Sequence, residues 1–145
     1  IGLARIKLGK QKKLELGNIY AKRDWGHAED YVQAMWKMLQ YNKPDDFVVC
    51  TGKQYSIKQF VNLVAKELRL QIKWKGKGIN EKACNISGDV IIECDKSYFR
   101  PLDVNTLLGD SKKARKKLNW KPQINLDSLI DEMILEENKI IDESR

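Results

Sequence analysis

The sequence is poor in the residues and runs that mark several classes of protein. Three prolines and nine glycines in 145 residues exclude collagen-like chains and proline-rich linkers. The longest uncharged apolar stretches, such as residues 47–50 and 90–92, are far too short to cross a bilayer. No charged-then-apolar leader opens the chain, so we expect a cytoplasmic protein with no membrane partner.

Cysteine and histidine are also scarce. Cys50, Cys84 and Cys94 are odd in number and, with His27 as the single histidine, match no zinc-binding spacing. Reduced thiols are expected in the cytosol, and an isolated cysteine is more often a small core residue than a nucleophile. We therefore predict neither a metal site nor a catalytic thiol.

Positive charge, by contrast, is in excess. The chain holds 27 Lys and Arg against 20 Asp and Glu, a formal net charge of +7. This balance favours an anionic partner, which could be nucleic acid, an acidic membrane surface or a small phosphorylated ligand. The densest basic run, residues 112–117, has neither a stacking platform nor a base-reading motif beside it, so we expect a solvated surface and no nucleic acid.

Hydrophobic periodicity predicts a mixed α/β fold with more helix than strand. The predicted helices cover residues 1–11, 31–39, 57–68, 111–119 and a last segment from about 126, with a helical turn at 102–108. The predicted strands cover residues 14–16, 47–50, 70–75 and 90–93, while 76–78 form a turn and 80–88 form a loop with a weak strand.

The all-apolar segment at residues 47–50 is typical of a strand covered on both faces within a larger α/β sheet. The chain supplies too few strands for a complete doubly wound sheet, and it lacks the glycine-rich turn that seats a dinucleotide. Residue 1 is Ile rather than Met. We therefore expect that part of the fold lies outside this chain.

One patch suited to a phosphorylated ligand lies at residues 17–27. It combines two cations, an acid, an indole and the single imidazole. The planar fork of Arg23 can donate two parallel hydrogen bonds to a phosphate. An alternative interpretation is a surface pair between Arg23 and Asp24, with Trp25 as a core anchor and His27 at the start of a helix.

A second patch lies at residues 98–103. Pro101 fixes the backbone after Arg100, and a helical turn would place Arg100 and Asp103 on neighbouring faces. Arg100 could then bind a diphosphate while Asp103 accepts from ribose hydroxyls, although an intramolecular ion pair is the alternative. A third motif, LNWKP at 118–122, is interpreted as a structural helix terminator.

Five motifs together resemble one known family. They are RDWGHAEDYV at 23–32, TGKQYS at 51–56, YFRP at 98–101, LLGD at 107–110 and LNWKP at 118–122. The first and last are similar to segments found throughout the extended short-chain dehydrogenase/reductases. The middle motifs are narrower and resemble the GDP-mannose 4,6-dehydratases, so we identify the chain as a member of that family.

The resemblance implies a Rossmann-like α/β architecture in two parts. In this family an N-terminal Rossmann half binds NADP and carries the catalytic residues, and a smaller mixed α/β half binds the nucleotide sugar. Residues 1–145 correspond to the C-terminal half, so the cofactor domain and the catalytic residues are expected elsewhere. No tyrosine of the chain is followed four residues later by lysine, which agrees with that division.

The implied activity is that of a lyase in deoxysugar (fucose) biosynthesis. GDP-mannose is oxidised at C4, loses water across C5 and C6, and receives hydride back at C6, so that NADP is regenerated. The full-length enzyme is expected to be a homo-oligomer, and the fragment to be inactive. Alternatives are a non-catalytic nucleotide-sugar-binding fragment or another GDP-sugar epimerase or dehydratase of the family.

The resemblance also assigns roles to single residues. Arg23 and Arg100 match the arginines that contact the nucleotide diphosphate. Asp103 stands where the family usually has Glu to accept from ribose hydroxyls, and its shorter side chain would weaken that contact or need a bridging water. Asn18 and Tyr98 are expected as further substrate neighbours.

Overall fold

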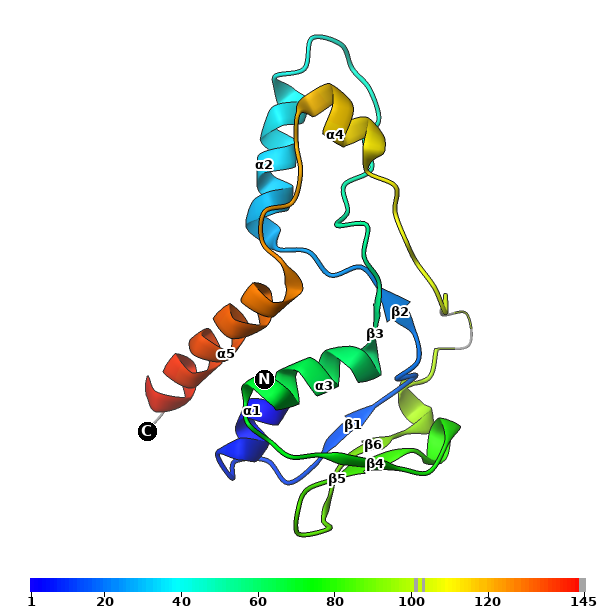
Figure 1. Ribbon diagram of the computed structural model, residues 1–145, viewed down its shortest axis with the longest axis vertical. Coiled ribbons are helices and arrows are strands. Elements are labelled where there is room, and N and C mark those ends of the chain that lie inside the picture. The colour runs from blue at the N-terminus through cyan, green and yellow to red at the C-terminus, as the bar shows by residue number, and fades with distance from the viewer. Residues whose placement is uncertain (101, 103, 144–145) are drawn as a thin grey trace. The chain divides into compact units, whose positions relative to one another are not determined.

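The computed structural model describes residues 1–100, 102 and 104–143 (Figure 1). It divides into two compact units: unit 1 contains Ile1–Ala21, Ser56–Asn105 and Ile130–Arg145, and unit 2 contains Lys22–Tyr55 and Thr106–Leu129. The helices are α1 (Gly2–Lys7), α2 (Ala28–Leu39), α3 (Ile57–Glu67), α4 (Lys112–Leu118) and α5 (Leu126–Glu143), with 3₁₀ turns η1 (Gly78–Asn80) and η2 (Lys96–Tyr98). The strands are β1 (Leu14–Leu16), β2 (Lys22–Arg23), β3 (Tyr55–Ser56), β4 (Lys73–Lys75), β5 (Lys82–Cys84) and β6 (Val90–Cys94).

Unit 1 is built on a four-stranded sheet in the order β1-β6-β5-β4. The β4–β5 and β5–β6 pairs are antiparallel, whereas β1 and β6 run parallel. Gly76 adopts a φ of +85° after β4, and a Cβ there would meet the carbonyl oxygen of Asn80, so the turn at this point requires glycine.

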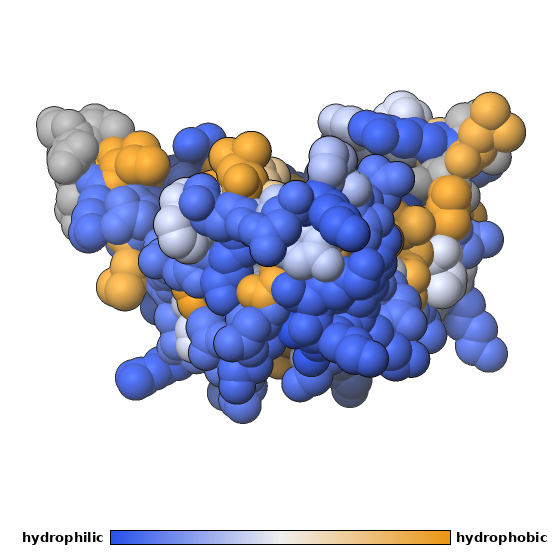
Figure 2. Space-filling view, turned by 90° about the horizontal axis from the view of Figure 1, so that it is seen from above, coloured by the Kyte–Doolittle hydropathy of each residue, from blue (hydrophilic) through white to orange (hydrophobic). Residues whose placement is uncertain are grey.

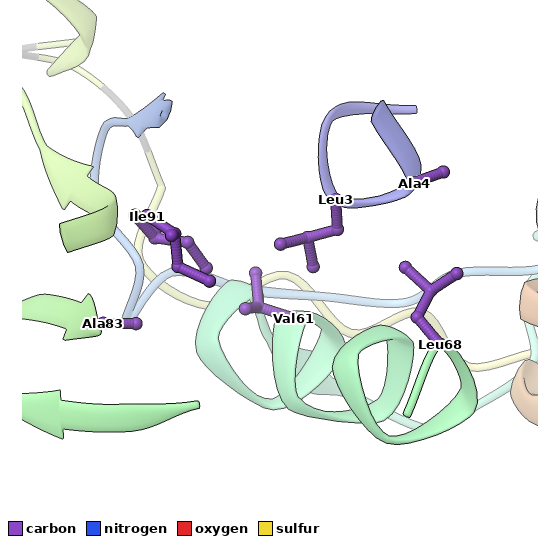
Figure 3. Close-up of a cluster of buried hydrophobic side chains, with 7 residues drawn as sticks. Leu3, Ala4, Val61, Leu68, Ala83 and Ile91 are labelled. Atoms are coloured by element: carbon purple, nitrogen blue, oxygen red, sulfur yellow. The ribbon is translucent and has the colours of Figure 1, made fainter. Parts of the chain in front are cut away.

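The core of unit 1 lies between this sheet and helices α1 and α3. Figure 3 shows side chains from α1, α3, β5 and β6 meeting in one cluster. Its buried members are Leu3, Ala4, Val61, Leu68, Ala83, Ile91 and Ile92. Helix α3 places Val61, Val64 and Leu68 on one stripe, as its spacing predicts, so burial of that stripe holds the helix on the sheet.

The start of α3 is fixed by its own sequence and by the preceding chain. The Ser56 hydroxyl accepts from the Gln59 backbone N–H while the Gln59 side chain accepts from the Ser56 N–H, which is a capping box. The backbone N–H groups of Ile57 and Lys58 donate to carbonyl oxygens of residues 21 and 19. The first amides of this helix are therefore all occupied within the protein.

Unit 2 is organised around α2 and α4, which pack against each other. Ala34, Ala114 and Leu118 are buried between them, together with Trp120. The indole N–H of Trp120 donates to the backbone carbonyl of Asp30 at 2.8 Å, which confirms the predicted structural role of the 118–122 motif. Asn119 adopts left-handed backbone with a φ of 46° and ends α4 there.

Several predicted elements differ in the structure. The segment 47–50 forms no strand, because a strand needs a hydrogen-bonded neighbour and no described residue supplies one; Val48 is 53% exposed. Residues 104–108 form no helix, and Thr106 bridges Lys22. The loop predicted at 80–88 contains β5, a central strand of the sheet. Helix α1 stops at Lys7, before a glycine with positive φ at position 9.

Much of the surface is hydrophilic. On the face drawn in Figure 2 polar side chains predominate and apolar ones form separate patches. None of the helices in the described part of the chain combines the length and apolar composition that a membrane span requires.

Candidate functional site

The parallel pair β1–β6 brings two of the predicted substrate segments together. Leu16 and Cys94 lie opposite each other at the carboxyl ends of these strands, and the Asp95 N–H donates to the Leu16 carbonyl at 2.8 Å. Residues 17–18 follow one strand and residues 95–100 follow the other. Ligands of open α/β sheets bind outside the carboxyl ends of parallel strands, so this edge is a candidate site.

Gly17 allows the two segments to approach closely. A Cβ at this position would lie 2.5 Å from the backbone oxygen of Tyr98, so any larger residue would force the two segments apart. The next residue, Asn18, is held by its side chain: its Oδ1 accepts from the Tyr20 N–H at 3.0 Å, and its Nδ2 donates to Asn105 Oδ1 at 3.1 Å. Asn18 is therefore next in the chain to the point where Gly17 lies against Tyr98.

The segment from Asp95 to Arg100 presents its side chains to solvent. Asp95 caps η2, because its Oδ1 accepts from both the N–H and the hydroxyl of Ser97 at 2.8 Å, and these hydrogen bonds lower the pKa of the Asp95 carboxyl. Tyr98 is 58% exposed, and Arg100 is exposed with no hydrogen bond or ion pair to a described residue. Asp103 lies outside the described residues.

A buried carboxylate supports the loop that carries Asn18. Glu81 is 4% exposed and receives hydrogen bonds from the Tyr20 hydroxyl and the Lys58 ammonium group. Lys58 also lies 4.9 Å from the centre of the Trp74 ring, a cation–π contact. Burial opposes ionisation of Glu81, but the two hydrogen bonds outweigh it and lower its pKa. Sequence reasoning missed Glu81, whose only signal was an isolated acid beside a turn.

The other predicted patch belongs to unit 2. Arg23 lies in β2 and donates from Nη1 to the Lys22 carbonyl at 2.8 Å. The neighbouring Asp24 carboxylate accepts from the Thr51 N–H at 3.1 Å, the Thr51 hydroxyl at 2.5 Å and the Gly52 N–H at 2.7 Å. Asp24 therefore ties the residues after β2 to the 51–52 turn, a role that the sequence did not reveal.

Trp25 and His27 are the last two side chains of that patch. Trp25 is only partly buried, so it does not fill the core as the alternative interpretation holds; Trp120, 2% exposed, is the tryptophan that fills the core. His27 is the N-cap of α2, and its Nδ1 accepts from the Glu29 N–H at 3.1 Å. The interpretation of His27 as a helix-start residue is confirmed.

Comparison with known proteins agrees with this architecture. The family described as GDP-mannose 4,6 dehydratase matches residues 1–133. The chain belongs to the GDP-mannose 4,6-dehydratase family. It is 48% identical to GDP-mannose 4,6 dehydratase 2 of Caenorhabditis elegans over 132 residues, and 47% identical to the Homo sapiens enzyme over 133 residues. Each alignment covers 91% of this chain but only 35% and 36% of the relative, so the chain spans little more than a third of their length.

Solved structures show the same fold. The chain is similar to RMD from Pseudomonas aeruginosa, solved with NADPH (TM-score 0.68, 22% identity, 88% of this chain and 37% of that one). It is also similar to UDP-glucose 4-epimerase from Thermotoga maritima, solved with UDP-glucose (TM-score 0.72, 18% identity, 97% of this chain and 38% of that one). The predicted mixed α/β fold class is therefore confirmed.

In the described part of the chain, no glycine-rich turn leads from a strand into an α-helix, as a dinucleotide site requires. A pyrophosphate binds at a helix N-terminus with free amides behind a glycine-rich turn. The first amides of α3 donate to Ile19 and Ala21 carbonyls, the Glu29 amide of α2 donates to His27, and the Ser128 amide of α5 donates to Asn125. We therefore assign no step of NADP chemistry to these residues.

Proposed function

We propose that this chain is the nucleotide-sugar-binding part of a GDP-mannose 4,6-dehydratase and that residues 1–145 form its C-terminal portion. The observation that carries the proposal is the identity of 47–48% to enzymes of that name over 91% of this chain. The parallel β1–β6 pair, whose carboxyl ends lead into the segments that carry Asn18 and Tyr98, supports it. The proposed substrate is GDP-mannose.

The roles of the site residues follow from their chemistry. Arg23 and Arg100 donate charge-assisted hydrogen bonds to the diphosphate, for which the guanidinium fork is suited. Asp103 accepts from the ribose hydroxyls, while Asn18 and Tyr98 border the nucleotide. The exposure of Arg100 supports its role, because an arginine reserved for a ligand must remain accessible.

The chemical steps belong to the rest of the proposed enzyme. NADP, which supplies hydride transfer when bound, would be held by an N-terminal Rossmann domain, and we propose that the complete protein is a cytoplasmic homo-oligomer. The 145-residue chain alone then binds GDP-mannose without converting it, because it contains no tyrosine followed four residues later by lysine. Incubation with GDP-mannose and NADP tests this: formation of the 4-keto-6-deoxy sugar by the chain alone would contradict it.

Titration calorimetry of the chain with GDP tests the binding role. We expect Arg100→Gln to weaken binding by about 1.5–3 kcal/mol, roughly tenfold or more, because a charge-assisted hydrogen bond is lost. Lys66→Gln is the matched control, since Lys66 is an exposed cation on α3 and its loss changes the net charge equally. Equal affinity of the Arg100→Gln and Lys66→Gln variants would overturn the assignment.

A further inference from the structure

A cavity of about 230 Å³ in unit 2 has no part in the proposed binding of GDP-mannose. It is lined by Trp25, Thr51, Lys53, Tyr55, Arg115 and residues 121–126. The lining contains the three cations Lys53, Arg115 and Lys121 and no carboxylate. A second cavity adjoins it and shares Arg115 and Lys121; its lining adds Lys37, again without a carboxylate.

The guanidinium of Arg115 is held in place by neutral groups. Its Nε donates to the Ser111 hydroxyl at 3.1 Å, and its Nη2 donates to the Thr51 carbonyl at 3.0 Å. Neither acceptor carries a charge, and a guanidinium has five N–H donors, so the fork keeps donors for a further acceptor. Arg115 is thus fixed at the cavity wall with its charge uncompensated by either partner.

Three of the other cations in the basic run are paired with carboxylates. Lys113 and Lys117 both form ion pairs with Asp45, and their hydrogen bonds lower the pKa of that carboxyl to about 2. Lys112 likewise pairs with Asp110. Three lysines of the basic run are therefore paired with carboxylates, Lys116 is exposed outside the lining, and Arg115 lines a cavity without a carboxylate.

A buried donor lies in the chain segment that lines the cavity. The side-chain nitrogen of Gln54 is buried and has no hydrogen-bond partner among the described residues. Its neighbours on both sides, Lys53 and Tyr55, belong to the lining. Cations close together repel one another unless an anion neutralises them, and a buried donor without an acceptor is costly.

We propose that this cavity binds the phosphate group of a small phosphorylated ligand. Arg115 donates to the phosphate through its fork, and Lys53 and Lys121 contribute point charges. The volume is below that of pockets for drug-sized ligands, which suits a phosphate, pyrophosphate or phosphomonoester rather than a dinucleotide. Trp25 and Tyr55 offer aromatic surfaces beside the phosphate position for a ring carried by such an ester.

The test is an NMR titration of the ¹⁵N-labelled chain at constant ionic strength, with inorganic phosphate, pyrophosphate and GMP as separate probes. We expect saturable shifts of the Trp25 indole and of backbone amides at 51–53 and 121–126. Equal affinity for phosphate and GMP identifies the bare anion as ligand, whereas tighter binding of GMP identifies a phosphomonoester. Shifts that do not saturate, or that miss these residues, overturn the proposal.

Charge-matched variants distinguish a specific phosphate site from general electrostatic attraction of anions to a basic protein. Lys121→Gln should weaken pyrophosphate binding about tenfold, and it spares the fold because no described residue bonds its ammonium group. Lys116→Gln, an equal charge loss on α4 outside the lining, should change affinity less than about twofold. Equal weakening by both variants would overturn the proposal. Arg100→Gln should leave these shifts unchanged, so failure of the GDP assignment remains a separate result.

Discussion

The buried carboxylate of Asp30 offers a sharp test of how unit 2 is held together. Asp30 is 1% exposed at the start of α2, and its two oxygens accept from the backbone N–H groups of Gln123 at 3.0 Å and Ile124 at 2.9 Å. Its backbone carbonyl accepts from the Trp120 indole. Asp30 therefore joins α2 to the segment that follows α4.

The expected loss of stability follows from these bonds. Asp30→Ala leaves two backbone amides without acceptors, and each unsatisfied amide costs about 1–3 kcal/mol of stability. The higher helix propensity of Ala offsets about 0.5 kcal/mol of this loss. Because both amides are only partly buried, water can reach them, and we expect a net loss of about 2–3 kcal/mol. Asp30→Asn keeps one acceptor oxygen and should cost about half as much.

The assay combines urea denaturation with amide hydrogen exchange. Exchange at Gln123 and Ile124 reports the two hydrogen bonds directly, even if the two units unfold separately. Glu29→Ala is the matched control, since Glu29 is the exposed acid one residue earlier in the same helix turn. The reasoning fails if Asp30→Ala costs no more than Glu29→Ala, or if exchange at the two amides is unchanged.

Two further predictions concern unit 1. The lowered pKa of Glu81 means that its ionised form stabilises the fold above its ordinary pKa of 4.5, and that this stability is lost as the pH falls through the lower folded value. Glu81→Gln should therefore remove part of the acid sensitivity of the urea midpoint, and parallel pH profiles for the two proteins would contradict this. Gly17→Ala should lower both the melting temperature and GDP affinity, because its Cβ would lie 2.5 Å from the Tyr98 carbonyl oxygen; calorimetry showing unchanged GDP affinity would refute the placement of this edge in the site.

The helices were predictable because their signals are local. Ser56 followed by Gln59 forms the capping box, and Asn119 ends α4 in left-handed backbone, so both boundaries are encoded within a few residues. The periodic spacing of apolar residues that predicts α2 and α3 likewise lies within one continuous segment for each helix. The 47–50 segment shows the limit of such signals: its composition is that of a strand, but pairing depends on a neighbour elsewhere in space.

The candidate site was predictable only in its parts. Motif resemblance named Asn18, Arg23, Tyr98, Arg100 and Asp103, and the structure places Gly17, the residue before Asn18, against Tyr98. The supporting carboxylates could not be found in this way. Whether an acid is buried depends on which groups fold around it.

The sequence by itself determined the family, the positions of most helices and the excess of positive charge, because motifs, spacing and composition need no knowledge of distant contacts. The tertiary structure decided which charges are neutralised and which are not. Asp45 forms ion pairs with Lys113 and Lys117, which lie more than sixty residues further along the chain. Arg115 lies between these two lysines in the sequence, but it lines a cavity whose lining contains no carboxylate. Electrostatic energy depends on distance in space, and only the fold sets that distance.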